Sequence, residues 1–168
     1  MGKKLLYKDK WSTIFLEPVV VRGKRVHITS RVEPDVAVVI PILDDGRLLL
    51  ERQYRHTLRR YMYEFPAGMV EKKEKPVTAA KRELQEETGY VAKSVVYLFS
   101  QYPSMYNTRR FHFYRAKGLR QTGKTHFDPA EEITLVRFMP AEVEEMIKNG
   151  KIKDAKTVAG YLYYRTYK

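Results

Sequence analysis

The sequence has no cysteine among its 168 residues. Disulfide bridges, thiolate metal sites and a cysteine nucleophile are therefore excluded. It also lacks an apolar run long enough to cross a membrane. The first ten residues, MGKKLLYKDK, lack the apolar segment and the small-residue cleavage site of a secretory signal. We therefore expect a cytoplasmic protein that makes no membrane contact.

Acidic side chains are few beside basic ones, with 20 Asp and Glu against 32 Lys and Arg, so the net charge is +12. A strongly basic surface suggests a polyanionic partner such as a nucleotide or a nucleic acid. A basic surface without a specific partner is an equal alternative, because Lys and Arg are scattered along the whole chain. The length and the 43% hydrophobic content favour one globular domain with its own core.

The order of the expected elements predicts a mixed α/β domain of the α+β type. Residues 13–33 are expected to form two strands around a turn at Gly23. Asp45-Gly46 separates two apolar runs, which predicts a β-hairpin. Further strands are expected at residues 91–100, 109–116 and 134–138, and helices at residues 77–88, 140–149 and 154–167. Strands come first, one helix lies in the middle, and strands and helices follow.

Three glutamates share one side of the helix expected at residues 77–88. Glu83 and Glu87 are four residues apart and Glu86 lies three after Glu83, so all three project together. Like charges at this spacing destabilise a bare helix, although Arg82 can pair with Glu86. An all-oxygen donor set without His or Cys suits Mg²⁺ or Mn²⁺, and Mg²⁺ readily bridges to phosphate oxygens. A solvated acidic helix face is the alternative interpretation of the same spacing.

The stretch from Gly68 to Tyr90 reads G-x5-E-x7-R-E-U-x-E-E-x-G-U, where U is an apolar residue. This pattern resembles the Nudix box, and only Tyr90 departs from it, at a place that usually takes an aliphatic residue. The segments RQYRH (52–56), YEFPAGMVE (63–71) and IKDAKTVAGYL (152–162) are similar to the ADP-ribose and nucleoside-diphosphate-sugar pyrophosphatase branch of the Nudix hydrolases. The resemblance therefore covers nearly the whole chain.

The resemblance implies a Nudix α/β/α sandwich with a mixed sheet over residues 36–168, preceded by an N-terminal antiparallel strand region over residues 1–35. In that branch the N-terminal region helps to form a homodimer, and both subunits contribute to the substrate site. Such enzymes use a divalent ion, here Mg²⁺ or Mn²⁺, to split the pyrophosphate of ADP-ribose or a related nucleoside diphosphate sugar. The products are a nucleoside monophosphate and a sugar phosphate.

The resemblance also implies roles for single residues around the metal. The expected ligands are the carboxylates of Glu83, Glu86 and Glu87 and the backbone carbonyl of Ala67. Arg82 is expected to serve catalysis by orienting these carboxylates, and Glu86 is counted with it among the catalytic residues. Glu74 either supports the loop before the helix or an additional metal ion, or is a plain surface residue.

Candidate substrate contacts are Arg52, Arg55, Glu64 and Met105. One of the two arginines is expected to bind the diphosphate or the terminal ribose, because a planar guanidinium bonds well to phosphate oxygens. The alternative is that both are strand residues that face water. Glu64 either contacts a sugar hydroxyl or braces Arg52. Met105 stands where the branch usually has a proline, which leaves broader nucleotide-sugar use open.

Catalysis also needs a base that activates water, and the branch takes it from a loop acid after the core strands. The stretch HFDPAEEITLV offers Asp128, Glu131 and Glu132. Glu131 is the predicted base and Glu132 the alternative, while His126 is interpreted as an ordinary strand or loop residue. Two other functions stay open: a Nudix enzyme acting on RNA 5′ ends, and a nucleotide-binding module without catalysis.

Overall fold

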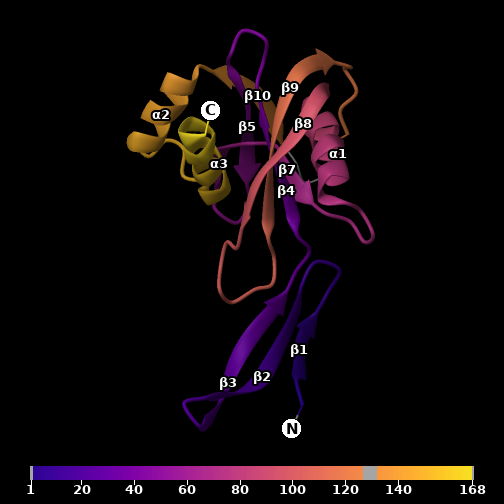
Figure 1. Ribbon diagram of the computed structural model, residues 1–168, viewed down its shortest axis with the longest axis vertical. Coiled ribbons are helices and arrows are strands. Elements are labelled where there is room, and N and C mark those ends of the chain that lie inside the picture. The colour runs from indigo at the N-terminus through magenta and orange to yellow at the C-terminus, as the bar shows by residue number, and fades with distance from the viewer. Residues whose placement is uncertain (1, 127–131, 168) are drawn as a thin grey trace.

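The computed structural model describes residues 2–126 and 132–167. The strands of these residues lie in three sheets, and the helices cover two of them (Figure 1). No helix in the described ranges is long and apolar enough to cross a membrane.

The first sheet is antiparallel and has the order β1-β2-β3. Its strands are β1 (Lys4–Lys8), β2 (Thr13–Val21) and β3 (Lys24–Val32). Arg22 and Gly23 join β2 to β3 with φ angles of 49° and 76°, and positive φ at both central residues is typical of a tight hairpin turn. The two strands predicted around Gly23 are confirmed, whereas β1 was not predicted. Figure 1 shows this sheet projecting away from the rest of the molecule.

The second sheet is mixed and has the order β7-β4-β9-β8. Its strands are β4 (Val36–Pro41), β7 (Ala67–Met69), β8 (Tyr90–Gln101) and β9 (Phe111–Gln121). β4 runs parallel to β9 and antiparallel to β7, which makes β4 a central strand with both edges paired. The third sheet is antiparallel, with β5 (Leu48–Arg55) between β6 (Arg60–Glu64) and β10 (Ile133–Phe138).

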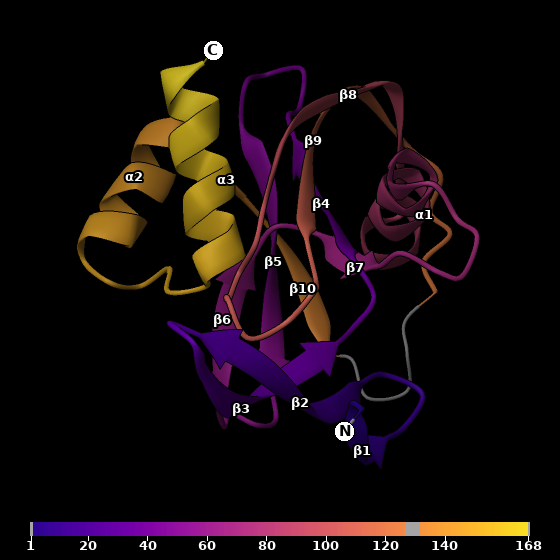
Figure 2. The same ribbon diagram turned by 60° about the horizontal axis from the view of Figure 1, so that its bottom comes forward.

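Side chains along β4 alternate between two cores, because successive residues of a strand point to opposite faces. Val38 and Ile40 belong to a cluster that includes residues of α2 (Pro140–Lys148) and α3 (Ala155–Thr166). Ala37 and Val39 pack instead with residues of α1 (Pro76–Thr88). Figure 2 shows α1 on one side of the strands and α2 with α3 on the other. The predicted α/β/α sandwich with a mixed sheet is therefore confirmed.

The ends of α1 follow from the residues that flank it. Pro76 occupies the first turn, where its missing N–H costs no hydrogen bond. Gly89 ends the helix with φ 70° and ψ 13°, a left-handed conformation that glycine adopts without a steric penalty. The helix predicted at residues 77–88 is confirmed, as are the two later helices, within two residues at each end.

The predicted hairpin at Asp45-Gly46 is confirmed at its turn but not as a pair of strands. The Gly46 N–H donates to the Leu43 carbonyl at 2.9 Å. Beyond an isolated bridge between Ile42 and Leu48, however, β4 and β5 do not pair within the described residues. Both edges of β4 are already occupied by β7 and β9, so β5 enters another sheet.

Candidate active site

α1 turns two of its acidic side chains toward the inside of the molecule. Glu83 and Glu87 are only 8% and 5% exposed. A buried carboxylate is costly unless it is paired or holds a cation. The opposite side of the helix packs Ala80 and Leu84 into the core. A merely solvated acidic face is therefore the wrong interpretation for Glu83 and Glu87.

Arg82 holds the acidic cluster together. Its Nη1 donates to Glu83 Oε1 at 2.7 Å and to Glu86 Oε2 at 2.9 Å. Its Nε and Nη2 reach the two carboxylate oxygens of Glu74 at 3.1 and 3.0 Å, and Nη2 also donates to the Met69 carbonyl at 2.9 Å. The hydrogen bonds with Glu74 raise the pKa of Arg82 and lower that of Glu74. The predicted pair with Glu86 is confirmed, and Glu74 supports the loop before α1.

β7 approaches these carboxylates so closely that it has no room for a side chain at Gly68. A Cβ atom there would lie 2.0 Å from Glu83 Oε1. One residue earlier, the Ala67 N–H donates to Glu87 Oε2 at 2.9 Å. Gly68 is thus required by the close approach of its backbone to a functional group rather than by a turn.

A cleft of about 1110 Å³ opens beside this backbone. One wall is α1, with Arg82, Glu83, Glu86 and Glu87, and β7 adds the backbone at residues 67–69. Another wall consists of residues 154–156, which are the first two residues of α3 and the residue before them. The remaining wall residues include Lys10 and Trp11 of the β1–β2 turn, Pro103, Arg109 and His126. The cleft therefore joins the Nudix-like motif to segments far away in the sequence.

The donor atoms at this cleft fit a hard divalent cation. Carboxylate and carbonyl oxygens are the ligands that Mg²⁺ prefers, and neither His nor Cys accompanies them on α1 and β7. Each carboxylate offers about four lone-pair sites, so a bond to Arg82 or Ala67 does not use up its acceptor capacity. In the part of the chain that the structure describes, no three acidic or histidine side chains already converge as a metal cluster. We expect a bound ion to draw the glutamates together.

Residues 33–161 match the family model described as the NUDIX domain. The chain belongs to the Nudix family. It is 28% identical over 166 residues to an ADP-ribose pyrophosphatase of Bacillus subtilis (strain 168). The aligned region covers 97% of this chain and 90% of that protein. It is 35% identical over 132 residues to a methanol dehydrogenase activator of Bacillus methanolicus, which covers 77% of this chain and 71% of that protein.

A solved structure has the same fold. The crystal structure of an ADP compounds hydrolase superimposes with a TM-score of 0.84, covering 99% of this chain and 94% of that chain at 21% identity. The resemblance to the ADP-ribose pyrophosphatase branch of the Nudix hydrolases is confirmed by these findings. The chain is accordingly a Nudix pyrophosphohydrolase.

A buried ion-pair network lies next to the Nudix carboxylates. Glu64 is 2% exposed and accepts from Arg55 Nε at 2.7 Å and Nη2 at 2.6 Å. It also accepts from Lys156 Nζ, which donates in addition to Asp154 Oδ1 at 3.0 Å. Burial by itself would raise the pKa of Glu64, but the hydrogen bonds and charges of Arg55 and Lys156 outweigh it and lower the pKa to about 2.

The prediction that Glu64 braces Arg52 is wrong, because Glu64 braces Arg55. Glu51 and Glu64 are cross-strand partners and share a face of the sheet. Arg55 lies four residues after Glu51 and is on that face, whereas Arg52 lies on the other face. The Arg52 guanidinium instead stacks 3.6 Å from the ring centroid of Tyr61.

The four predicted substrate contacts lie outside the cleft wall as the described residues define it. Arg52, Arg55 and Glu64 belong to the neighbouring β5–β6 pair. Met105 is 90% exposed at the tip of the loop between β8 and β9, while Pro103 and Arg109 of the same loop line the cleft. The assignment of these four residues as substrate contacts stays a prediction.

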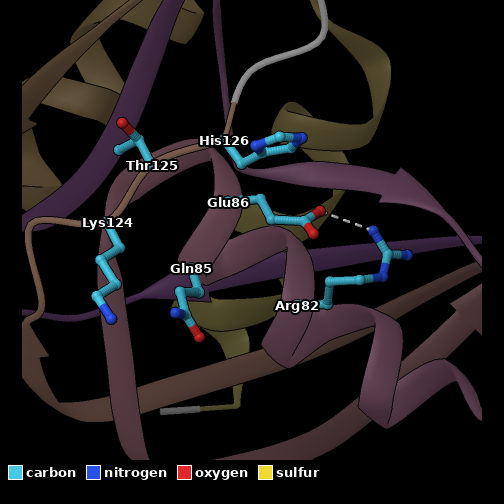
Figure 3. A pocket seen from close by; sticks show the side chains of 6 residues that line it. All are labelled: Arg82, Gln85, Glu86, Lys124, Thr125 and His126. Atoms are coloured by element: carbon cyan, nitrogen blue, oxygen red, sulfur yellow. Dashed lines mark hydrogen bonds and ion pairs between the residues drawn. The ribbon is translucent and has the colours of Figure 1, made fainter.

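His126 is a site residue that sequence reasoning did not single out. It lines the cleft and also a neighbouring hollow of about 440 Å³, beside Glu86 and Arg82 (Figure 3). Its N–H donates to the Glu86 carbonyl at 2.8 Å, and the Thr122 N–H donates to the Gly89 carbonyl at 2.7 Å. These bonds hold residues 122–126 against the end of α1. No local motif marks His126, because its neighbours come from a helix about 40 residues away.

The predicted bases are only partly within the described residues. Glu131 and Asp128 lie outside them. Glu132 accepts a hydrogen bond from the Tyr61 hydroxyl, and its carbonyl accepts from the Tyr54 N–H at 3.2 Å. These contacts tie Glu132 to the third sheet, and Glu131 stays the predicted base.

Proposed function

We propose that the chain hydrolyses the pyrophosphate bond of ADP-ribose or a related nucleoside diphosphate sugar to a nucleoside monophosphate and a sugar phosphate. The observation that carries this proposal is the acidic wall of α1, where Glu83 and Glu87 are buried beside a cleft of about 1110 Å³. Similarity to the ADP-ribose pyrophosphatase of Bacillus subtilis along 97% of this chain supports the substrate class.

The proposed cofactor is Mg²⁺ or Mn²⁺, held by Glu83, Glu86, Glu87 and the carbonyl of Ala67. Bound there, the ion would neutralise phosphate charge and lower the pKa of the attacking water. Arg82 orients two of these carboxylates through the bonds described above, and the Ala67 N–H positions Glu87. Glu131, or Glu132 in its place, would accept the proton of the attacking water.

We further propose that residues 1–35 form a region for dimerisation and substrate binding, and residues 36–168 the hydrolase domain. The β1–β2 turn supports a role in binding because Lys10 and Trp11 line the cleft. The Trp11 ring is 44% exposed and offers an aromatic surface for a base.

A homodimer is proposed from the surface of the first sheet. Large apolar side chains there are more than a third exposed, among them Leu5, Val20, Val21, Val26 and Ile28. Exposed apolar surface of this kind marks an interaction site in a soluble protein. A second copy of the chain is the proposed partner, and the cytoplasmic location stays a prediction.

The direct test is product analysis. The full chain would be incubated with Mg²⁺ or Mn²⁺ and ADP-ribose, ADP-glucose, GDP-mannose, NADH or 5′-triphosphate RNA. We expect AMP and ribose 5-phosphate from ADP-ribose. Cleavage of the RNA alone would favour an enzyme of RNA 5′ ends, and no cleavage of any compound would favour a binding module.

A further inference from the structure

Lys156 is a buried cation in the wall of the active-site cleft. It lies near the start of α3 and lines the same cleft as Glu83, Glu86 and Glu87. Its side chain is only 12% exposed, whereas the other lysines of the wall, Lys10 and Lys72, are exposed. An ammonium group is strongly hydrated in water, so its burial beside a phosphate-handling site calls for an explanation.

The neighbours of Lys156 keep it charged without using all its donors. Burial would lower the pKa of Lys156, but the negative charges of Asp154 and Glu64 raise it. The ammonium has three N–H donors, and the structure shows bonds to Glu64 and Asp154. Among the described residues, the structure shows no acceptor for its third donor.

The backbone around Lys156 is fixed in place. Asp154 Oδ2 accepts from the Thr157 N–H at 2.8 Å and from its hydroxyl at 2.7 Å, which caps α3. Thr157 Oγ1 in turn accepts from the Phe65 N–H at 2.9 Å, two residues before Ala67. These bonds therefore fix the position of Lys156 relative to the segment that leads into β7, the strand beside the proposed metal ligands.

The charges of the two walls differ. On the α1 wall the three glutamates outnumber Arg82, so that wall is negative. On the α3 side the two cations Arg55 and Lys156 balance the two anions Glu64 and Asp154. A diphosphate in the cleft needs donors on the side away from the metal-binding carboxylates, and an ammonium point charge is suited to phosphate oxygens.

We propose that Lys156 is a substrate-binding residue that donates its third N–H to a phosphate oxygen of the bound nucleoside diphosphate sugar. This inference rests on the proposed function and names a further residue of the same site. Glu64 then acts as a positioning residue because it pairs with Lys156, and Arg55 supports Glu64 by pairing with it in turn.

The test measures product binding rather than turnover. AMP and ribose 5-phosphate, which each carry one of the two phosphates, would be titrated separately by calorimetry into the full-length protein with Mg²⁺. Lys156→Met should weaken binding of at least one product by roughly 10- to 100-fold, the scale of one hydrogen bond to a charged group. Lys153→Met removes the same charge from an exposed residue and should leave both affinities unchanged.

A second variant separates contact from support. Asp154→Asn keeps the Lys156 ammonium but removes the charge of one of its two ion-pair partners, so product affinity should fall less than in Lys156→Met. A larger loss in Asp154→Asn than in Lys156→Met would overturn the contact, as would wild-type affinity of Lys156→Met for both products. If Lys156→Met does not fold, Lys156→Gln carries the same expectations. A wild-type protein that neither cleaves nucleotide sugars nor binds either product would instead overturn the proposed function itself.

Discussion

The first sheet and the hydrolase core of this chain bury their strands to very different degrees. Every residue of β4 is buried, and helices cover both of its faces. No residue of β1, β2 or β3 within the described bounds is buried. Within the described residues no helix covers this sheet, so it exposes apolar side chains of the kind that the core buries.

This difference separates two sources of stability. The core is complete within one chain, because β4 lies between two helical layers. The first sheet gains little stability from packing within its own chain, since a small sheet needs a packed hydrophobic face to be independently stable. It contributes Lys10 and Trp11 to the cleft all the same. We therefore expect core variants to change chemistry and sheet variants to change assembly.

The largest effect is expected from removing the metal. EDTA should abolish hydrolysis and added Mg²⁺ should restore it. Glu87→Gln keeps the shape of the side chain but removes a ligand charge, so turnover should collapse while the circular dichroism spectrum and the dimer persist. Full activity in EDTA would contradict a metal-dependent mechanism. Loss of folding in Glu87→Gln would show instead that Glu87 has a structural role.

The predicted base should come next. Glu131→Gln should lower kcat by roughly 10²–10⁴, the range typical of general-base loss, with little change in substrate affinity. Glu132→Gln is the matched control, because Glu132 already bonds to Tyr61. Normal turnover of Glu131→Gln with a collapse in Glu132→Gln would move the assignment by one residue.

Gly68→Ala tests the close approach within the core. The added Cβ would displace the Glu83 carboxylate, the end of a flexible side chain, so the fold should persist. Metal affinity should fall by about 10–100-fold, the scale of disturbing the support of a ligand. Gly46→Ala is the contrasting control. The φ angle of Gly46 is 84°, which is strained for alanine, but no atom lies within 4 Å of the added Cβ. The free energy of unfolding should therefore fall, whereas the metal affinity should not change.

The first sheet can be tested without touching the core. Val26 and Ile28 are 39% and 45% exposed and lie two residues apart on β3, on one face. The double variant Val26→Asp with Ile28→Asp should yield monomers in light scattering, because a dimer interface does not bury unpaired charges. The double threonine variant keeps the strand preference and should retain more dimer. A monomeric wild-type protein would contradict the proposed dimer.

The smallest effect is an acid dependence of core stability. The pKa of Glu64 is lowered to about 2 from its ordinary 4.5, so its contribution is present above pH 4.5 and is lost as the pH falls toward 2. A shift of this size corresponds to about 3 kcal/mol. Urea unfolding of wild type and Glu64→Gln should therefore differ most near pH 7 and converge toward pH 2. A difference that does not change with pH would show that Glu64 is not charged in the folded protein.

Local patterns predicted the acidic helix better than they predicted strand pairing. The spacing of Glu83, Glu86 and Glu87 with Arg82 needs only the geometry of one helix, and α1 has it. The Asp45-Gly46 dipeptide specifies a turn but cannot specify which strands pair, since that depends on the other edges of β4. Likewise, the sequence pattern does not show which arginine of β5 shares a face with Glu64, because that depends on the register of β5 against β6.

The sequence by itself determined the acidic helix, its glycine end and the family, because those features lie within short stretches whose periodicity is local. Only the tertiary structure decided which distant residues line the cleft. Lys156 meets Glu64 across 92 residues of chain, and His126 reaches Glu86 from a separate segment. Such contacts are stabilised by packing of whole layers, and no pattern within a single helix or strand encodes them.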